Sequence, residues 1–402
     1  MGSYLIKKDI FIEIREGLAK ILVPNPELFR RPDGVYEPAW APVFYNPQMV
    51  FNRDIAILFL RVIKKYTKLR RVYEPLAGTG VRGIRFVIEV GEIDRVIMND
   101  IDRRAYEVMK LNVELNKLSD VIELRNEDAN KLMFDEISKG YKACYIDIDP
   151  FGSPAPYVQS SLILTRRNGF VSYTATDMAP LTGKYPSKAL RRYQVRLVKT
   201  DFEKEIALRS LISYIIRKGA EHDIAAEPVL AYYADHYIRT YFMIKKGAME
   251  ADNLLQNLGY IIYCPKCLYR EPIRNYPIIK DIPQCPRCNS NIEIIGPLWL
   301  GKLVDKELLN NMKNELSKIN WLQTINRITK LLDMLAMESE IRNPFYYKVD
   351  ELCSKLRTHM PKILNIIECL ESKGYRTTRT HFDNVGIKTE APINEVESCI
   401  RT

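Results

Sequence analysis

The sequence predicts an α/β fold, in which a doubly wound, mainly parallel sheet with an N-terminal arm is followed by a smaller α+β domain. Two observations lead to this prediction. Apolar runs alternate with amphipathic segments long enough to form helices, a pattern typical of βαβ units. Near residue 251 the pattern changes to a segment rich in cysteine and proline. Because 402 residues exceed what one hydrophobic core usually spans, we expect two domains, at residues 1–251 and 252–402.

The first 50 residues are expected to form an extended arm that lies over another surface. Long helices are excluded there by a series of prolines, namely Pro24, Pro26, Pro32, Pro38, Pro42 and Pro47. A helical pattern follows at residues 54–65. The strands of the parallel sheet are then expected at residues 71–76, 95–100, 121–125, 143–148 and 169–176.

Two further β-rich runs, residues 228–233 and 237–244, are separated by only a few residues. We therefore expect them to form an antiparallel pair at the edge of the sheet. Beyond residue 251, helical patterns cover residues 302–340 and 351–372, which gives the second domain its mixed character.

The composition indicates a folded protein of basic character. With 47% hydrophobic and 27% charged residues, it excludes a disordered or fibrous chain. The net charge of +10 is compatible both with a polyanionic partner such as nucleic acid and with a mildly basic enzyme that has none. No apolar run approaches the roughly 18 residues of a membrane span, and residues 1–13 lack a secretory signal pattern. We expect a cytoplasmic protein with no membrane partner, and no feature indicates an obligate protein partner.

The eight cysteines fall into two groups. Two Cys-x2-Cys pairs, Cys264 with Cys267 and Cys285 with Cys288, have the spacing of a four-thiolate zinc site. Four thiolates leave no open coordination position, so the zinc ion should be structural. The alternative is a set of free buried cysteines. A reducing compartment makes a disulfide framework unexpected, and the remaining cysteines are expected to be small buried hydrophobic residues: Cys144, Cys353, Cys369 and Cys399.

Acidic residues and glycines follow the expected strands where such folds bind nucleotides. Glu74 ends the first strand and precedes a turn containing Gly78 and Gly80. This turn alone would suit a dinucleotide, S-adenosylmethionine or simple packing. Asp100 ends the second strand at the distance typical of a ribose contact, and Asp128 after the third can accept a hydrogen bond from an adenine amino group. A carboxylate at Glu74 would attract a cationic methionyl group and repel a pyrophosphate, which favours S-adenosylmethionine.

The fourth strand leads into Asp149-Pro150-Phe151-Gly152, which points to chemistry on an exocyclic amine. Such an amine is a poor nucleophile, because its lone pair is delocalised into the ring. A carboxylate from Asp149 and the carbonyl of Pro150 could accept its two N–H bonds and orient the lone pair. Phe151 could stack on the flipped base. The alternative is an ordinary turn with a capping aspartate, but the other strand-end carboxylates favour the catalytic interpretation.

Together with its flanks, this tetrad resembles one family. Asp147-Ile-Asp149-Pro-Phe151-Gly-Ser-Pro154 and the segments 44–54, 174–181 and 380–389 are similar to those of the tRNA guanine-N2 dimethyltransferases that modify guanine 26, and the similarity covers nearly the whole chain. The resemblance implies a class I, Rossmann-like methyltransferase fold that uses S-adenosylmethionine. One small departure is the turn Ala77-Gly-Thr-Gly80, where the family has Ala-Thr-Gly.

Family membership further implies roles for individual residues. Asp149 would be the catalytic acceptor, and Phe44 and Phe151 would hold the guanine between them. The residues implied to contact S-adenosylmethionine are Arg53, Arg71, Asp100, Asp128 and Ala129. Without the resemblance, the two arginines would be interpreted as surface charges and Phe44 as a core aromatic.

A basic stretch follows the fifth expected strand. Residues 178–200 contain no acidic residue, and Tyr185 and Tyr193 lie among their basic side chains. The candidates for contact with an RNA backbone are Lys184, Lys188, Arg191, Arg192 and Arg196. A solvated helix face is the alternative explanation.

We therefore predict an enzyme that transfers one or two methyl groups from S-adenosylmethionine to N2 of guanine 26 in tRNA. The C-terminal, zinc-containing domain would help to bind the tRNA. Two alternatives stay open: a methyltransferase acting on another exocyclic amine of a nucleic acid, such as adenine N6, and a non-catalytic, zinc-stabilised RNA-binding protein.

Overall fold

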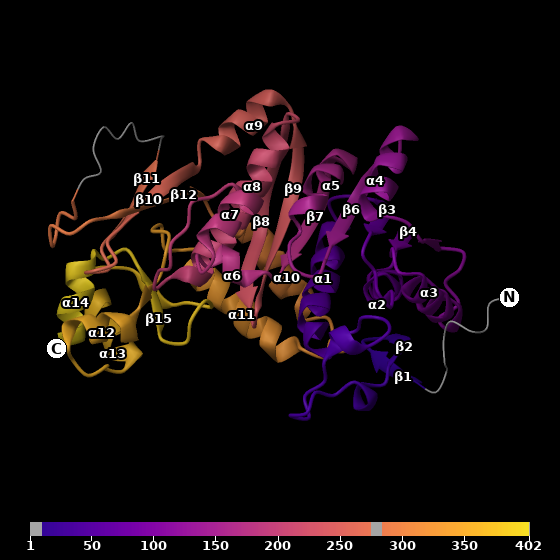
Figure 1. The fold of residues 1–402 in the computed structure, drawn as a ribbon, viewed down its shortest axis with the longest axis horizontal. Helices are drawn as coiled ribbons and strands as arrows, with labels where there is room; N and C mark the ends of the chain where they lie inside the picture. The colour runs from indigo at the N-terminus through magenta and orange to yellow at the C-terminus, as the bar shows by residue number, and fades with distance from the viewer. Residues whose placement is uncertain (1–9, 275–283, 402) are drawn as a thin grey trace. The chain divides into compact units, whose positions relative to one another are not determined.

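The computed structural model describes residues 10–274 and 284–401, whose ribbon is drawn in Figure 1. The chain divides into two compact units that are interleaved in sequence. The first unit comprises residues 1–150, 156–173 and 310–329. The second comprises residues 151–155, 174–309 and 330–402. Each unit is built from segments that lie far apart in the sequence. The domain boundary expected at residue 251 stays a prediction. Residues 1–9, part of the segment searched for a secretory signal, lie outside the described residues.

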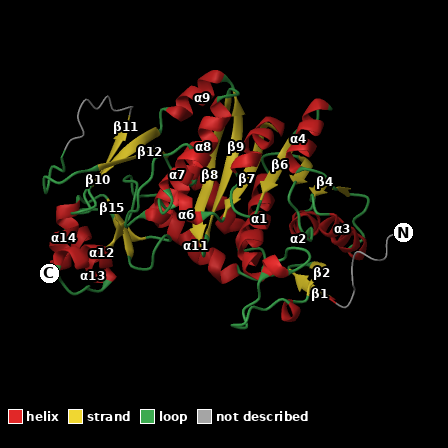
Figure 2. Cartoon of the chain, viewed as in Figure 1, coloured by secondary structure: helices red, strands yellow, loops and turns green. Residues whose placement is uncertain are grey.

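The first unit contains the N-terminal hairpin and the parallel part of the main sheet. Helices and strands alternate along it (Figure 2). Its elements are β1 (Phe11–Glu16), β2 (Ala19–Pro24), α1 (Val50–Ile63), β3 (Leu69–Glu74), α2 (Val81–Arg85), β4 (Ile93–Asn99), α3 (Arg103–Leu115), β5 (Ile122–Arg125), α4 (Ala129–Ser138), β6 (Ala143–Ile148), α5 (Val158–Leu164) and most of β7 (Thr165–Ala175).

The main sheet has seven strands in the order β5-β4-β3-β6-β7-β9-β8. Its neighbours from β5 to β7 pair in parallel, whereas β8 (Ile224–Ala234) and β9 (Tyr237–Lys246) pair antiparallel at one edge. The predicted α/β class and the antiparallel edge pair are thus confirmed. Because β3, β4, β5 and β6 are parallel, their carboxyl ends lie at one edge of the sheet, where ligands bind in such folds.

Burial explains why the strands could be recognised from sequence. All six residues of β6 are buried, as in a parallel strand covered on both faces. The predicted bounds of this strand agree with the structure, whereas β7 begins four residues before the expected residue 169. No helix among the described residues has the length and apolarity needed to cross a membrane.

From residue 10 to residue 49, the part of the arm that the structure describes consists of the β1–β2 hairpin followed by short 3₁₀ turns, and this part contains no long helix, as expected. Each of these turns begins with proline directly after a residue whose side chain accepts a backbone N–H. The turns are Pro26–Leu28 after Asn25, Pro38–Trp40 after Glu37, and Pro47–Met49 after Asn46. Proline suits the first position of a helical turn, because the N–H that it lacks would have no helical partner.

The second unit adds two small sheets and a set of helices. One three-stranded sheet has the order β11-β10-β12 and the other β13-β15-β14. Besides β8 and β9, its elements are α6 (Met178–Leu181), α7 (Pro186–Tyr193), α8 (Glu203–Ala220), α9 (Ala248–Leu255), β10 (Leu258–Tyr263), β11 (Arg270–Arg274), β12 (Glu293–Trp299), α10 (Lys306–Leu316, which runs into the first unit), α11 (Ile325–Glu338), β13 (Tyr347–Lys348), α12 (Val349–Leu356), α13 (Ile363–Ser372), β14 (Thr377–Arg379), β15 (Gly386–Thr389) and α14 (Ile393–Arg401).

Candidate active site

Three carboxylates surround one guanidinium at the carboxyl ends of β3 and β6. Arg82, in the first turn of α2, is only 2% exposed. Its Nη2 donates to Asp149, its Nη1 lies 3.5 Å from Asp147 Oδ2, and its Nε lies 3.8 Å from Glu74 Oε1. We call these four residues the site cluster. The cluster contains three acidic groups and one basic group, so a bound cation would improve its balance of charge.

Neighbouring side chains fix the cluster from the side of the core. The Tyr145 hydroxyl donates to Asp147 Oδ2 at 2.7 Å, and Arg82 Nη1 donates to Asn52 Oδ1 of α1 at 3.0 Å. Asp149 differs from the other two carboxylates because its side chain is 20% exposed, against 5% for Glu74 and 0% for Asp147. Asp149 is therefore the member of the cluster that a substrate can reach.

Glu74 has an altered acidity. Burial raises the pKa of this carboxyl to about 8, and the negative charges of Asp147 and Asp149 act in the same direction. Arg82 and a 2.9 Å hydrogen bond from the Gly83 N–H oppose the rise. At neutral pH Glu74 is thus mostly protonated, and a bound cation would favour its ionised form.

The glycine turn after β3 is fixed by hydrogen bonds that involve Asp100 and Asn99. The Gly78 N–H donates to Asp100 Oδ2 at 2.9 Å. Gly80 has φ +76° immediately before α2, and a Cβ there would lie 2.8 Å from the Met98 side chain. The positive φ favours glycine at this position, and a side chain there would also have to displace the Met98 side chain. Asn99 donates to the carbonyls of Pro75 and Glu127, both at 2.9 Å, and so holds the turns after β3 and β5 together.

Asp128 and Ala129 begin α4, and the Asp128 side chain accepts the Lys131 N–H at 2.9 Å. Two residues close to Asp100 or Asp128 were not among the candidates chosen from the sequence. Ile101 is 68% exposed although it is a large aliphatic residue directly after Asp100. Burial raises the pKa of Tyr157, and the charges of Asp128 and Asp100 add to this rise, so its hydroxyl lies within their influence. An apolar residue next to a strand-end acid was the available signal for Ile101.

The two arginines implied to bind the cofactor make other contacts. Arg53 in α1 donates to both Glu16 oxygens, at 2.6 and 2.7 Å. Arg71 in β3 donates to Glu136 at 3.1 Å and lies over the Tyr141 ring, 3.8 Å from its centroid. Their cofactor contacts stay predictions. The guanidinium that the structure places among the strand-end acids is that of Arg82.

The two aromatic residues implied to hold the base lie in different units. Phe44 is half-buried, and its carbonyl oxygen would be 3.1 Å from a Cβ at Gly78, so its backbone borders the glycine turn. Phe151 is 68% exposed, directly after Pro150. A guanine held between their rings stays a prediction.

Three of the predicted RNA contacts gather on α7. Lys188, Arg191 and Arg192 line a hollow of about 200 Å³. Arg192 also donates to Asp177 at 2.8 Å. The other two candidates lie outside the hollow lining: Lys184 is exposed, and Arg196 pairs with Glu293 at 3.1 Å.

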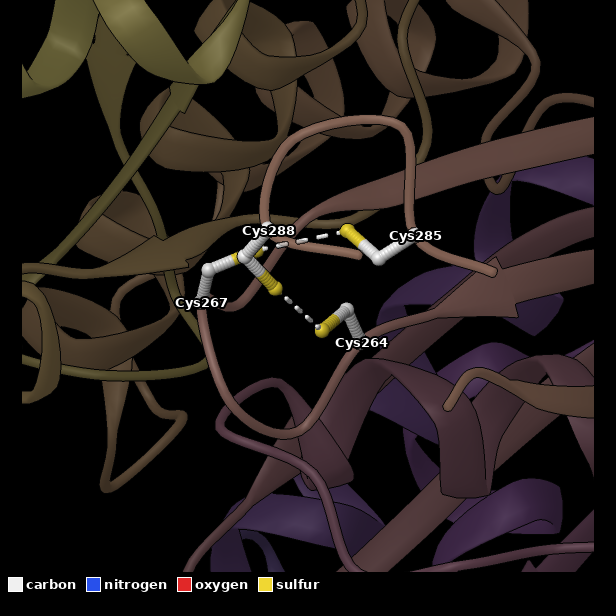
Figure 3. A group of neighbouring side chains, drawn as sticks. All are labelled: Cys264, Cys267, Cys285 and Cys288. Carbon is white, nitrogen blue, oxygen red and sulfur yellow. Dashed lines mark hydrogen bonds between the residues drawn. The ribbon is translucent and has the colours of Figure 1, made fainter. Parts of the chain in front are cut away.

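The two Cys-x2-Cys pairs converge in the second unit (Figure 3). All four sulfur atoms lie within 4.8 Å of one another, and the Cys264–Cys288 and Cys267–Cys285 sulfur distances are 3.6 and 3.5 Å. Tetrahedral zinc with bonds of about 2.3 Å would place its thiolates about 3.8 Å apart. The donor set and its spacing therefore fit a tetrahedral metal ion.

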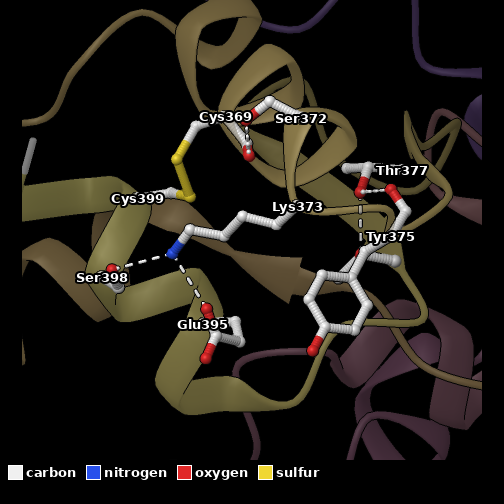
Figure 4. Close-up of a disulfide and its surroundings, with 9 residues drawn as sticks. Cys369, Ser372, Lys373, Tyr375, Thr377, Glu395, Ser398 and Cys399 are labelled. Carbon is white, nitrogen blue, oxygen red and sulfur yellow. Dashed lines mark hydrogen bonds and ion pairs between the residues drawn. A yellow bond between two sulfur atoms is a disulfide. The ribbon is translucent and has the colours of Figure 1, made fainter.

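One prediction about the cysteines is wrong. Cys369 and Cys399 form a disulfide between α13 and α14, with Cα atoms 5.8 Å apart (Figure 4). They were expected to be unpaired because their spacing matched no motif and a reducing compartment was assumed. A bridge across 30 residues depends on how two helices pack, which the spacing does not reveal. Cys144 and Cys353 are buried free thiols, as expected.

Comparisons with known proteins decide the family. A family model described as N2,N2-dimethylguanosine tRNA methyltransferase matches residues 17–401. The chain belongs to this family. The tRNA (guanine(26)-N(2))-dimethyltransferase of Sulfurisphaera tokodaii is 40% identical over 390 residues, which cover 97% of this chain and 99% of the relative. The protein of the same description from Sulfolobus acidocaldarius is 38% identical, with 97% of each chain covered.

A solved structure supports the same assignment to the dimethylguanosine tRNA methyltransferases. Trm1 from Pyrococcus horikoshii, in complex with S-adenosyl-L-methionine, is 34% identical and has a TM-score of 0.83, covering 97% of this chain and 99% of that chain. The family, the class I methyltransferase fold and the enzyme class predicted from the sequence are confirmed.

Proposed function

We propose that this protein transfers methyl groups from S-adenosylmethionine to N2 of guanine 26 in tRNA. One observation carries the proposal. Asp149 is the reachable carboxylate of the site cluster, and it is followed by Pro150, which lacks an N–H, and by the exposed ring of Phe151. This arrangement offers two acceptors and a stacking surface to a flat base with an exocyclic amine.

The chain's contribution is mainly to bind and orient the amine. S-adenosylmethionine supplies an activated methyl group on a sulfonium. Asp149 and the Pro150 carbonyl accept the two N–H bonds of the guanine amine, so that its lone pair points at the methyl carbon. Phe44 and Phe151 hold the flipped base between them. As the amine forms its bond to the methyl carbon, the displaced electron pair stays on sulfur, and Asp149 or water takes the released proton.

The methyl donor would lie along the carboxyl ends of β3, β4 and β5. Its fit is supported by the acid excess of the site cluster, which suits a cationic ligand, and by the exposed Ile101 beside Asp100. The residues proposed to hold it are Arg53, Arg71, Glu74, Gly78, Gly80, Asp100, Asp128 and Ala129. We add Arg82, Ile101 and Tyr157 to this proposal because of their positions beside these acids.

We propose that the four clustered cysteines hold a structural zinc ion. Four thiolates complete a tetrahedral shell and leave no position for substrate. Metal analysis should find about one zinc ion per chain in the wild type and in Cys353→Ser, a control at a buried free thiol. Cys264→Ser should lose the metal and unfold the second unit at lower temperature. Unchanged zinc content in Cys264→Ser would refute the site.

The proposed tRNA contacts lie on α7 and directly beside it in the sequence. Lys184, Lys188, Arg191, Arg192 and Arg196 would contact phosphates, and the second unit would supply further binding surface. Neutralising one phosphate contact should weaken tRNA binding and lower the salt dependence of the affinity by about one unit of slope.

Nucleoside mass spectrometry tests the proposed activity. Unmodified tRNA incubated with the protein and labelled S-adenosylmethionine should yield methylated guanosine, and a transcript with adenine at position 26 should yield none. Asp149→Ala should abolish transfer but still bind tRNA, whereas Asp94→Ala, an exposed aspartate at the start of β4, should be as active as the wild type. Methylated adenosine would favour the adenine N6 alternative. Full transfer by Asp149→Ala would refute the catalytic role of Asp149.

A further inference from the structure

The loop that follows Asp149 is held at Gly152 and Ser153 by hydrogen bonds to residues outside the loop. Gly152 forms two hydrogen bonds with Thr176, the residue directly after β7: its N–H donates to Thr176 Oγ1 at 2.8 Å, and its carbonyl accepts the Thr176 N–H at 2.9 Å. The Ser153 hydroxyl lies 2.6 Å from the hydroxyl of Tyr193, the last residue of α7. Phe151 therefore precedes two residues whose positions are fixed by groups outside the loop.

The contact at Tyr193 continues through the helix. The Tyr193 hydroxyl donates to Asp177 Oδ1 at 2.6 Å, so the Ser153 hydroxyl is the donor to Tyr193. Arg192 donates to the other Asp177 oxygen at 2.8 Å. The chain of contacts thus runs Ser153, Tyr193, Asp177, Arg192, and it ends at a residue that also lines the basic hollow on α7.

The middle of this chain is buried, which makes its hydrogen bonds costly to lose. Tyr193 is fully buried and packs edge-on against Tyr214, with ring centroids 5.6 Å apart. Burial raises the pKa of Tyr193 far above its usual value, and the charge of Asp177 adds to this rise, so the hydroxyl keeps its proton. A buried hydroxyl with two polar partners is a firm point of attachment for the loop.

Arg192 can bind Asp177 and a phosphate group at the same time. A guanidinium has five N–H donors, so one edge can stay on Asp177 while another binds a phosphate. Lys188 and Arg191 stand beside it in the same hollow. A phosphodiester bound there would contact the residue that ends the chain of contacts to Ser153.

We propose that Tyr193 and Asp177 are positioning residues that hold the Phe151–Ser153 loop in its base-binding place, and that Arg192 joins this hold to an RNA phosphate on α7. This inference rests on the proposed function, since it assigns the loop to the guanine. It predicts that loss of the Tyr193 hydroxyl slows methyl transfer in the bound complex and leaves the affinity for tRNA unchanged.

Single-turnover kinetics of Tyr193→Phe test this proposal. The substitution removes only the hydroxyl, and the rate of transfer at saturating tRNA and S-adenosylmethionine should fall roughly tenfold. The dissociation constants of both substrates should stay within about twofold of the wild type. Tyr263→Phe is a matched control, because Tyr263 is also buried in the second unit and donates to Asp201 at 3.1 Å. It should transfer at the wild-type rate.

A double-mutant cycle with Phe151→Leu separates positioning from general destabilisation. If Tyr193 acts through the loop, Tyr193→Phe should cost less than about twofold once Phe151 is replaced. Multiplicative effects of the two substitutions would overturn the proposal, as would a wild-type rate for Tyr193→Phe. Should Tyr193→Phe fold poorly, Ser153→Ala removes the same link from the loop side and should give the same rate loss. If the wild type forms no methylated guanosine, the proposed function itself fails, whatever these variants show.

Discussion

Two buried glutamates of the first unit differ in charge at neutral pH: Glu16 is ionised, and Glu74 is mostly protonated. Glu16 is 1% exposed and Glu74 4%. Burial alone would raise the pKa of both. The charges and hydrogen bonds of Arg53, the charge of Arg85 and the Tyr45 hydroxyl nevertheless lower the pKa of Glu16 to about 2, whereas Glu74, with one shared arginine nearby, has a pKa raised to about 8.

The surroundings of Glu16 form what we call the arm cluster. Arg85 lies at its centre and donates to Glu16 at 2.8 Å, to Asp54 at 2.7 Å and to Glu89 at 2.7 and 2.9 Å. The cluster comprises Glu16, Arg53, Asp54, Arg85 and Glu89. It fastens the arm hairpin, and it leaves little space at the turn: a Cβ at Gly17 would lie 2.2 Å from Glu89 Oε1.

The comparison shows how the same residue types serve two purposes. In the arm cluster two arginines share three carboxylates, and further donors such as the Thr324 N–H and hydroxyl satisfy Asp54 at 3.0 and 2.7 Å. In the site cluster one arginine serves three carboxylates. A buried excess of acid is unfavourable unless a cation joins it. The first arrangement suits a permanent structural link, and the second suits a site for a positively charged ligand.

The largest effect is expected from breaking the arm cluster. Arg85→Met would leave Arg53 as the one arginine of the arm cluster for three buried carboxylates, and removing one partner of a buried ion pair costs roughly 3–5 kcal/mol. Urea denaturation should show this loss in the free energy of unfolding. Arg103→Met, which removes an ion pair between the exposed Arg103 and the half-buried Glu107, is the control and should unfold like the wild type. An equally stable Arg85→Met would mean that the arm is held by apolar packing alone.

Breaking the site cluster should affect catalysis more than stability. Without Arg82, Asp149 loses the donor that orients it, and the transfer rate in Arg82→Met should fall about a hundredfold. Arg82→Lys keeps the charge but loses the planar fork, so it should recover part of that loss. Single-turnover rates measure both. A rate near that of the wild type in Arg82→Met would show that Asp149 needs no partner to act.

The strand-end acids of the site were predictable because they depend on local pattern. Short apolar runs marked the strands, so the residues at which they end, such as Glu74, Asp100 and Asp149, followed directly. The parallel order of the strands then brings those ends to one edge of the sheet.

The partners of these acids were not predictable in the same way. Whether Arg82 or Arg71 faces the acids depends on the direction in which a side chain leaves a short helix or a strand, and the family resemblance pointed to Arg71. The arm cluster joins residues as far apart as Glu16 and Arg85, and Thr324 reaches it from beyond the expected domain boundary. Such pairs result from tertiary packing, which one sequence does not encode in its spacing.

The smallest effect, and the sharpest test of the comparison, is the pH dependence of S-adenosylmethionine binding. The folded-state pKa of Glu74, about 8, lies above the ordinary value of 4.5. Its neutral form therefore stabilises the fold fully below pH 4.5, and this contribution is lost as the pH rises towards 8. A cationic ligand favours the carboxylate, so binding should release a proton below pH 8, and the affinity should rise by up to about tenfold per pH unit until Glu74 is ionised.

Calorimetry in buffers of different ionisation enthalpy measures that proton release directly. Glu74→Gln should remove both the release and the rise in affinity, whereas Glu107→Gln, a change at a carboxylate outside the site cluster, should keep them. Glu16 should contribute nothing in this range, because its pKa of about 2 keeps it ionised throughout. An affinity independent of pH in the wild type would mean that the excess acid of the site cluster is neutralised within the protein, and that the two clusters differ in geometry but not in purpose.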